Sequence, residues 1–520
     1  MRARTVTATA AALTAVVLAG PACSPPVPPP GSRAAAHAPE RFAGQAIAWH
    51  ACRTGPDDTE GEELDAAGAR CGEVTVPLDH RHPEGATLDV AVSRLPATDP
   101  ARRRGALLYN PGGPGVPARY LSLLLRRAEP EVAARYDLIG MDPRFVGRSA
   151  PLDCGWPTVS VGAAGPDRAG FEKNVRLARE LASLCAGRRS VLPHASTRNT
   201  ARDMDVVRSA LGERRVSYLG SSYGTYLGEV YLQLFPGRVD RAVLDSPLDP
   251  DLFGPDLTRT AGPAVERALR RWAGWAARHD DRYHLGATGA RVRETVGRLT
   301  AAVERRPVRI GGHAVDSRVL PQLLWGVTAG DDAEAYGGFA ADVGALVAAA
   351  RGDDGVEVPS GLAATLEGLA SADGDGTFSA QTAIQCADRA VSRDPETSYR
   401  DIEAHRADEP VFGPLTRTVT PCSFWPVAPA EPPTRVRNDV PVLLVGASGD
   451  PAAVRAGQLS AHRALTGSRL VTLPGAFRHT VYAGLFAARD ACVERAVNTY
   501  LVDGVLPDRD VTCPRPAPVP

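Results

Sequence analysis

The sequence has almost no net charge, since its 59 lysine and arginine residues are balanced by 60 aspartate and glutamate residues. A protein that binds nucleic acid or an anionic membrane surface through electrostatics needs a basic face to attract phosphate groups. We therefore expect neither nucleic acid nor a charged lipid surface among its partners.

Recognisable metal-binding patterns are also missing. The nine cysteines form no C-x-x-C motif and no cluster with histidine at the spacing of metal ligands, so we expect no metal site.

Setting Cys23 aside leaves eight cysteines, and an even number favours disulfides in an exported protein. Eight cysteines can pair in many ways, so as a hypothesis we join neighbours along the chain: Cys52 with Cys71, Cys154 with Cys185, Cys386 with Cys422, and Cys492 with Cys513.

Apolar segments of membrane-spanning length are missing too. Residues 6–20 form an apolar stretch that follows two arginines and leads to Cys23, an order typical of an export signal. We predict a signal peptide over 1–23, a proline-rich linker over 24–40, and a secreted protein. The alternative is a lipoprotein signal, in which a lipid on Cys23 holds the protein at the cell surface and is its only membrane contact.

Short apolar runs that suit buried strands alternate with helical patterns in the first half of the chain. This alternation is typical of a mostly parallel sheet flanked by helices, and it opens here with an antiparallel pair. The predicted strands are 73–78, 88–95, 106–109, 137–142, 216–219 and 241–245, followed after a long gap by 440–445 and 469–473.

The gap between these two groups of strands is rich in helical patterns, and no convincing buried strand interrupts them. We interpret it as a mainly helical cap, residues 249–435, inserted into an α/β core formed by 41–248 and 436–520. Trp272 and Trp275 are expected to pack inside this cap.

A G-x-S-x-G pattern, Gly220 to Gly224, lies between a predicted strand and a predicted helix. In this context the small residues allow a sharp turn that exposes the serine hydroxyl, here that of Ser222. The pattern alone is weak, so its partners decide its meaning. A serine nucleophile needs a base to take its proton and a third group to orient that base.

Asp450 and His479 each follow a late predicted strand and supply these partners. The order serine, acid, histidine is that of the α/β-hydrolase fold. Asp245, which ends its own predicted strand, is the rival acid. We prefer Asp450 because it follows the penultimate strand of the returning sheet.

The glycine-rich loop from Asn110 to Gly115 follows another predicted strand. Glycine lets a backbone N–H approach a substrate closely, as an oxyanion hole requires. We assign the two oxyanion donors to the N–H groups of Tyr223 and Gly113, with Gly112 as a close rival of Gly113.

At these motifs the sequence resembles the secreted tripeptidyl aminopeptidases of actinomycetes and related prolyl-aminopeptidase-like α/β-hydrolases. The resemblance implies an exopeptidase that acts on peptides with a free N-terminus beneath a helical cap, without a cofactor. It covers nearly all of the chain after the signal and is carried by Asn110-Pro-Gly-Gly-Pro-Gly115, Gly220-Ser-Ser-Tyr-Gly224, Leu244-Asp-Ser-Pro-Leu-Asp-Pro250, Ala383-Ile-Gln-Cys-Ala-Asp388, Gly449-Asp-Pro451 and Arg478-His-Thr-Val481.

Two departures from the family pattern are expected near the mouth of the site. Val116-Pro117-Ala118 follows the glycine loop where the family has small residues and serine, and Phe145 replaces a glycine. The leading hypothesis is a secreted serine aminopeptidase that releases di- or tripeptides. The alternatives are an esterase or lipase-like enzyme on the same scaffold and, with less support, a catalytically silent exported binding protein.

Overall fold

A computed structural model describes residues 40–373, 376–485 and 488–515. The predicted signal peptide, Cys23 and nearly all of the linker lie outside these residues. The described part contains a nine-stranded sheet in the order β1-β2-β4-β3-β5-β6-β9-β10-β11. Among the described residues no helix has both the length and the apolar character that a membrane crossing requires.

The sheet is antiparallel at one edge and parallel elsewhere. Strand β2 pairs antiparallel with both β1 and β4, and every pairing from β4 to β11 is parallel. This is the predicted α/β-hydrolase architecture. The strands are β1 (Arg70–Pro77), β2 (Thr87–Leu95), β3 (Gly105–Asn110), β4 (Tyr136–Met141), β5 (Val216–Ser221), β6 (Val239–Asp245), β9 (Val442–Ala447), β10 (Ser468–Leu473) and β11 (Val511–Thr512).

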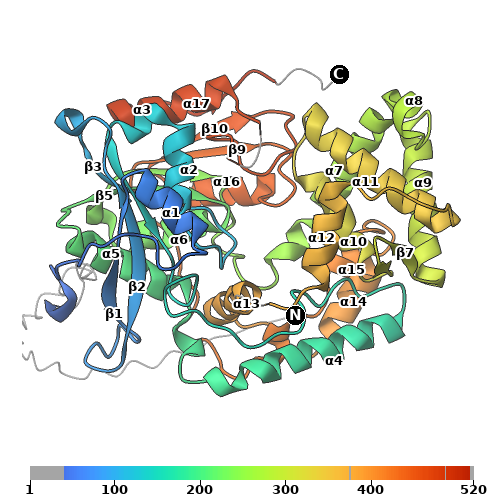
Figure 1. Cartoon of the computed structure of the whole chain (residues 1–520), viewed down its shortest axis with the longest axis horizontal. Helices are drawn as coiled ribbons and strands as arrows, with labels where there is room; N and C mark the ends of the chain where they lie inside the picture. The colour runs from blue at the N-terminus through green and yellow to red at the C-terminus, as the bar shows by residue number, and fades with distance from the viewer. Residues whose placement is uncertain (1–39, 374–375, 486–487, 516–520) are drawn as a thin grey trace, which may run out of the picture. The chain divides into compact units, whose positions relative to one another are not determined.

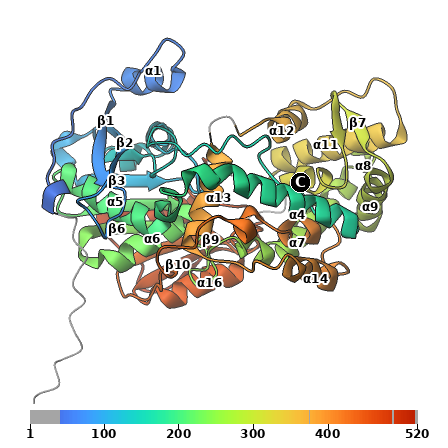
Figure 2. The same ribbon diagram turned by 90° about the horizontal axis from the view of Figure 1, so that it is seen from below.

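Helices cover both faces of the sheet, as Figures 1 and 2 show. Successive strand residues face opposite sides, so Leu107 packs in one hydrophobic cluster and Leu108 in another. The cluster of Leu108 includes residues of α5 (Thr197–Ala210), α6 (Tyr223–Leu234) and α16 (Arg455–Ala464). The cluster of Leu107 includes residues of α2 (Leu121–Ala128), α3 (Pro130–Ala133) and α17 (Ala491–Asn498). Burial on both faces explains why the central strands are mostly apolar.

The chain between β6 and β9 is mostly helical and has its own hydrophobic cluster. Trp272 and Trp275 are buried in it, as predicted. One expectation is wrong: a hairpin of β7 (Val308–Ile310) and β8 (His313–Val315) interrupts the helices. Strands of three residues are too short to show an alternating pattern. The helices are α7 (Gly262–Arg278), α8 (Asp280–Tyr283), α9 (Gly289–Arg305), α10 (Leu320–Leu324), α11 (Ala333–Arg351), α12 (Ser360–Ala370), α13 (Thr377–Asp388), α14 (Glu396–His405) and α15 (Gly413–Thr416).

A second excursion from the sheet lies between β4 and α5. Its helix α4 (Arg168–Leu184) packs beside α14, because Phe171 and Ala178 share a small apolar cluster with Ile402. Arg318 also donates from Nε to Asn174 Oδ1 at 3.0 Å. Helix α1 (Thr59–Ala66) precedes β1.

Disulfides join the four cysteine pairs proposed from sequence neighbourhood. Each pair links positions 19 to 36 residues apart and has a Cα–Cα distance between 4.9 and 5.8 Å. These short distances fall within the range that a disulfide requires.

Candidate active site

Ser222 occupies a sharp turn between β5 and α6. Its φ of 55° and ψ of −122° are rare for a residue with a side chain, and such strain is concentrated at functional sites. The two flanking glycines are needed for close packing. A Cβ on Gly220 would lie 2.3 Å from the carbonyl oxygen of Gly224, and a Cβ on Gly224 would lie 2.4 Å from that of Asn110. The structure therefore has the turn geometry expected of a nucleophile elbow.

Asp450 and His479 follow β9 and β10 and contact each other. The Nδ1 atom of His479 is 3.0 Å from Oδ2 and 3.1 Å from Oδ1 of Asp450. Oδ1 of Asp450 also accepts the N–H groups of Ala452 and Ala453, at 2.9 and 2.8 Å. The carboxylate is buried, whereas 24% of the His479 side chain stays exposed. The pair can therefore hold an imidazole with Nε2 available for proton transfer.

Asp245 has a different set of contacts. Its carboxylate accepts the backbone N–H groups of Val481 and Tyr482, at 3.0 to 3.1 Å, just after His479. Its carbonyl oxygen accepts the N–H of Ser222 at 2.9 Å. The hydroxyl of Ser246 accepts the N–H of Thr480 at 2.9 Å. The end of β6 thus connects the serine turn to the segment after β10 that carries His479, residues 474–482, which we call the histidine loop. Sequence reasoning missed this role.

Two groups in this region have shifted pKa values. Burial lowers the pKa of His479, but the charge of Asp450, its hydrogen bond and the charge of Asp245 together raise it above the ordinary value of 6.5. Burial raises the pKa of Asp245 to about 7, against the opposing effect of its backbone hydrogen bonds and of His479. Shifts of this kind concentrate at functional sites.

The glycine loop lies directly against the serine turn. A Cβ on Gly112 would be 2.9 Å from the Cβ of Ser222 and 3.2 Å from the backbone nitrogen of Tyr223. The N–H of Gly112 donates to Asn110 Oδ1 at 3.1 Å. By contrast, the N–H groups of Gly113 and Tyr223 have no acceptor among the described residues. This difference favours Gly113 over Gly112 as an oxyanion donor.

The two departures from the family pattern have different surroundings. Phe145 has a φ of 68° and is 4% exposed within the hydrophobic core, so the expectation that it lies at the site mouth is wrong. Its replacement of glycine places an apolar ring inside the fold at the cost of backbone strain. Val116 and Pro117 instead line a cavity of about 340 Å³ together with Tyr120 and Arg148.

The chain between β6 and β9, which we call the inserted region, supplies a buried carboxylate that accepts hydrogen bonds from the histidine loop. Asp331, between α10 and α11, accepts the N–H of Phe477 and the Nε–H of Arg478, both at 2.7 Å. Arg478 also donates to the carbonyl oxygen of Ala488 at 2.6 Å. These contacts fix the two residues that precede His479, and no motif in the sequence points to Asp331.

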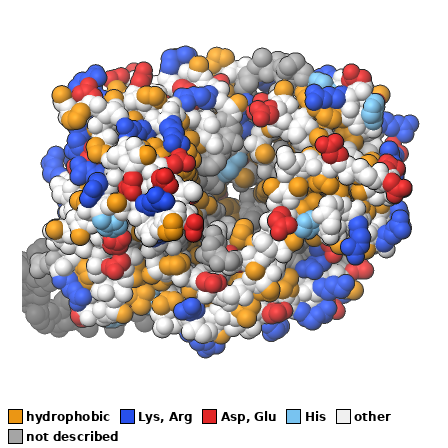
Figure 3. Space-filling model, in the orientation of Figure 1, with side chains coloured by type: hydrophobic (Ala, Val, Ile, Leu, Met, Phe, Trp, Pro, Cys, Tyr) orange, Lys and Arg blue, Asp and Glu red, His pale blue; other side chains and the backbone are white. Residues whose placement is uncertain are grey.

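Figure 3 shows a hollow in the surface of the molecule, between the side that contains the sheet and the side that contains α7 and α12.

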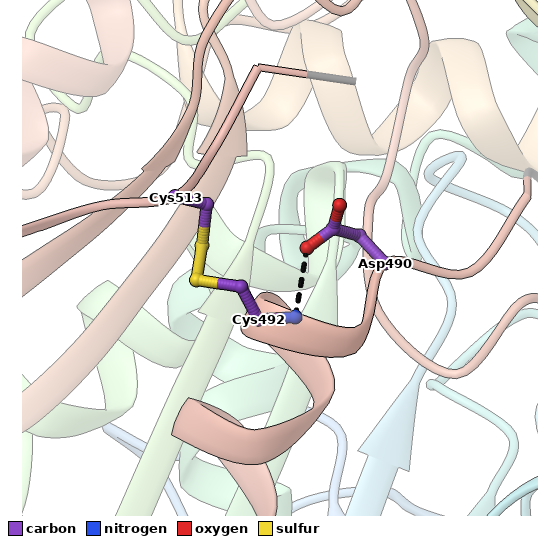
Figure 4. Close-up of side chains that lie close together, drawn as sticks. All are labelled: Asp490, Cys492 and Cys513. Carbon is purple, nitrogen blue, oxygen red and sulfur yellow. Dashed lines mark hydrogen bonds between the residues drawn. A yellow bond between two sulfur atoms is a disulfide. The ribbon is translucent and has the colours of Figure 1, made fainter. Parts of the chain in front are cut away.

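One aspartate and two cysteines, outside the set of residues described above, lie close together and are candidate metal ligands (Figure 4). Asp490, Cys492 and Cys513 offer atoms within 4.8 Å of one another, which is close enough for metal ligands. However, the two sulfurs form a disulfide of 2.03 Å, and Asp490 accepts the N–H groups of Cys492 and Val493 at the start of α17. A metal binds thiolates, so this oxidised pair does not fit a metal site.

Comparison with known proteins gives a consistent set of relatives. Residues 409–513 match the family model described as TAP-like protein. The tripeptidyl aminopeptidase of Streptomyces coelicolor is 36% identical over 479 residues, which cover 87% of this chain and 84% of that protein. The serine protease Hip1 of Mycobacterium tuberculosis is 29% identical, with 90% and 91% covered. Carboxylesterase B of Mycobacterium tuberculosis is 30% identical, with 89% of each chain covered.

Proposed function

Because this chain belongs to the tripeptidyl aminopeptidase-like α/β-hydrolases and is a serine hydrolase, we propose that it is a secreted exopeptidase that releases di- or tripeptides from free N-termini. The observation that carries the proposal is the contact between Asp450 and His479, on the same sheet edge as the Ser222 turn. The end of β6 hydrogen-bonds to both of the chain segments involved.

In the proposed reaction, Ser222 Oγ attacks the carbonyl carbon of the scissile peptide while His479 Nε2 takes the serine proton. Asp450 holds Nδ1 and stabilises the imidazolium. The carbonyl oxygen becomes an oxyanion, which the N–H groups of Tyr223 and Gly113 stabilise. His479 then protonates the leaving amine, the C–N bond breaks, and an acyl-enzyme remains. Water, deprotonated by His479, hydrolyses the ester and frees Ser222.

The need for a free N-terminus distinguishes this activity from that of an endopeptidase. We expect a tripeptidyl anilide with a free amino group to be cleaved and its N-acetylated counterpart to be cleaved at least about 100-fold more slowly, as measured by release of the aniline. A loss of this size is the scale for leaving a charge-recognising site unpaired. Equal rates for both compounds would exclude an aminopeptidase.

An esterase is the second candidate, and the similarity to carboxylesterase B favours it. A serine hydrolase site acylates with esters as well as amides, so the ratio of kcat/KM values decides. We expect kcat/KM for a tripeptidyl ester to exceed that for a short acyl ester lacking the peptide. A preference for the short acyl ester would support the esterase.

Export is part of the proposal and is supported by the arrangement of charge and apolar residues in 1–23. N-terminal sequencing of the protein recovered from culture medium would test it. We expect cleavage after Ala22. Protein that is found only inside the cell, with residues 1–22 still attached, would contradict export.

A further inference from the structure

Helix α13 contacts the loop that carries one proposed oxyanion donor. A Cβ on Gly115 would lie 2.8 Å from the carbonyl oxygen of Thr377 and 3.3 Å from the backbone nitrogen of Gln381, both in the first two turns of α13. Gly115 is two residues beyond Gly113 and itself has a φ of 95°. The first half of α13 therefore limits where the glycine loop can lie.

The other end of α13 contacts the residue that carries the second donor. Thr197 donates to Asp388, the last residue of α13, from its N–H to Oδ1 at 2.8 Å and from its hydroxyl to Oδ2 at 2.5 Å. The hydroxyl oxygen of Thr197 is also 2.8 Å from that of Tyr223. Asp388, Thr197 and Tyr223 are 7%, 0% and 1% exposed. Water therefore does not compete for these hydrogen bonds.

The direction of this chain of hydroxyl groups follows from the number of protons. Burial raises the pKa of Asp388 to about 7. When Asp388 is ionised, Thr197 donates its one hydroxyl proton in a hydrogen bond to the carboxylate, and the Tyr223 hydroxyl must then donate to Thr197. Tyr223 is thereby held at both ends: its hydroxyl through Thr197 and its backbone at the start of α6, beside Ser222.

Helix α13 is itself firmly attached. The disulfide of Cys386 with Cys422 joins it to the segment before β9, and Ala383 and Ile384 are fully buried in the main hydrophobic cluster. Arg389, which follows the helix, donates to the carbonyl oxygen of Phe253 at 2.7 Å, and the Phe253 ring stacks on Tyr226 at 4.1 Å. A helix held in this way can act as a fixed support.

We propose that α13 is the positioning element of the oxyanion hole. Its first half sets the place of Gly113 through Gly115, and Asp388 sets the place of Tyr223 through Thr197. The inference rests on the proposed function, because it requires Ser222 as the nucleophile. Preorganised donors stabilise the transition state more than the bound substrate, so their displacement lowers kcat and leaves KM nearly unchanged.

The test compares Thr197→Val, which removes the hydroxyl at nearly constant volume, with Thr197→Ser, which keeps it. We measure kcat and KM for a tripeptidyl anilide and inhibition by a tripeptidyl aldehyde and by the tripeptide product. Ser222 Oγ adds to the aldehyde carbon, its proton passes to His479, and the aldehyde oxygen occupies the oxyanion hole. The product makes no such adduct.

Thr197→Val should lower kcat by about 10- to 100-fold, the scale for a misplaced catalytic group, and change KM by less than about 2-fold. Aldehyde affinity should fall by the same factor as kcat, product affinity should not change, and Thr197→Ser should behave as the wild type. If Thr197→Val does not fold, Gly115→Ala, which displaces the loop at the other end of α13, must give the same pattern.

Wild-type kcat in the folded variant, or equal losses of aldehyde and product affinity, would overturn the inference. Fluorophosphonate labelling separates this failure from that of the proposed function. A wild type that takes no label at Ser222 rejects the function itself. A labelled, active wild type with an unaffected variant rejects only the role of α13.

Discussion

Asp245 ends β6 and Asp450 follows the neighbouring strand β9, and their contacts show that they have different roles. Sequence position favoured Asp450 as the partner of His479, and the structure places its carboxylate 3.0 Å from Nδ1. The role of Asp245 was not predictable, because its carboxylate binds backbone N–H groups 236 and 237 residues away. Contacts of this range depend on the finished fold, whereas the elbow and the glycine loop are local and can be recognised in sequence.

The first prediction concerns this pair of aspartates. Asp450→Asn keeps the shape of the side chain but no longer stabilises the imidazolium or fixes its tautomer. We expect kcat to fall on the order of 10³- to 10⁴-fold while the circular dichroism spectrum stays that of the folded protein. Asp245→Asn is the comparison, and it should lower thermal stability. Both carboxylate oxygens lie 3.0 Å from the Val481 nitrogen, so the NH2 group of the asparagine would face that N–H in either orientation. Full activity of Asp450→Asn would assign the acid role to Asp245.

The second prediction concerns pH. His479 must be neutral to accept the proton of Ser222. Burial lowers its pKa less than the charge of Asp450, the hydrogen bond to Asp450 and the charge of Asp245 together raise it. Activity should therefore be lost as pH falls through a midpoint above 6.5, measured as kcat/KM against pH. In Asp450→Asn the remaining activity should show a lower midpoint, since a negative charge has been removed. An unchanged midpoint would mean that another group controls the acid limb.

At the scale of secondary structure, long buried strands were predictable and short or irregular elements were not. Leu107, Leu108 and Tyr109 are apolar because helices cover both faces of β3, and this pattern is visible in sequence. The three-residue strands β7 and β8 are too short to give such a pattern. Phe145 shows a further limit: a positive φ predicts glycine, but burial of the ring in the core overrides that preference.

The third prediction concerns the histidine loop as an element. Asp331→Ala leaves the buried guanidinium of Arg478 without its partner and removes the acceptor of the Phe477 N–H. Loss of one member of a buried pair typically costs about 3–5 kcal/mol. We expect denaturant unfolding to report a loss of this size and kcat to fall, because the residues that precede His479 lose two hydrogen bonds.

The matched control for Asp331 is an exposed ion pair. Arg102 and Asp99 have side chains that are 65% and 32% exposed, and exposed ion pairs contribute little to stability because water screens them. Asp99→Ala should therefore leave both stability and kcat close to those of the wild type. Equal effects of the two substitutions would show that Asp331 has no special role in holding the histidine loop.

At the scale of the whole molecule, the sequence predicted the core more completely than the inserted region. The motifs at Asn110–Gly115, Gly220–Gly224, Gly449–Pro451 and Arg478–Val481 lie at the ends of strands that the sheet brings together, so their joint pattern predicts the fold and the candidate site. Residues of the inserted region, such as Asp331 and Asp388, reach the site only through tertiary contacts. Substrate choice depends on those contacts and therefore requires experiment.

The central claim is that Ser222 is the nucleophile of a serine hydrolase. The most direct measurement is labelling by a fluorophosphonate, which reacts with an activated serine and releases fluoride. Mass spectrometry of digested wild type should find one stoichiometric label, located on Ser222, and Ser222→Ala should take none while remaining folded. Absence of label on the wild type, or equal labelling of Ser222→Ala, would contradict the account.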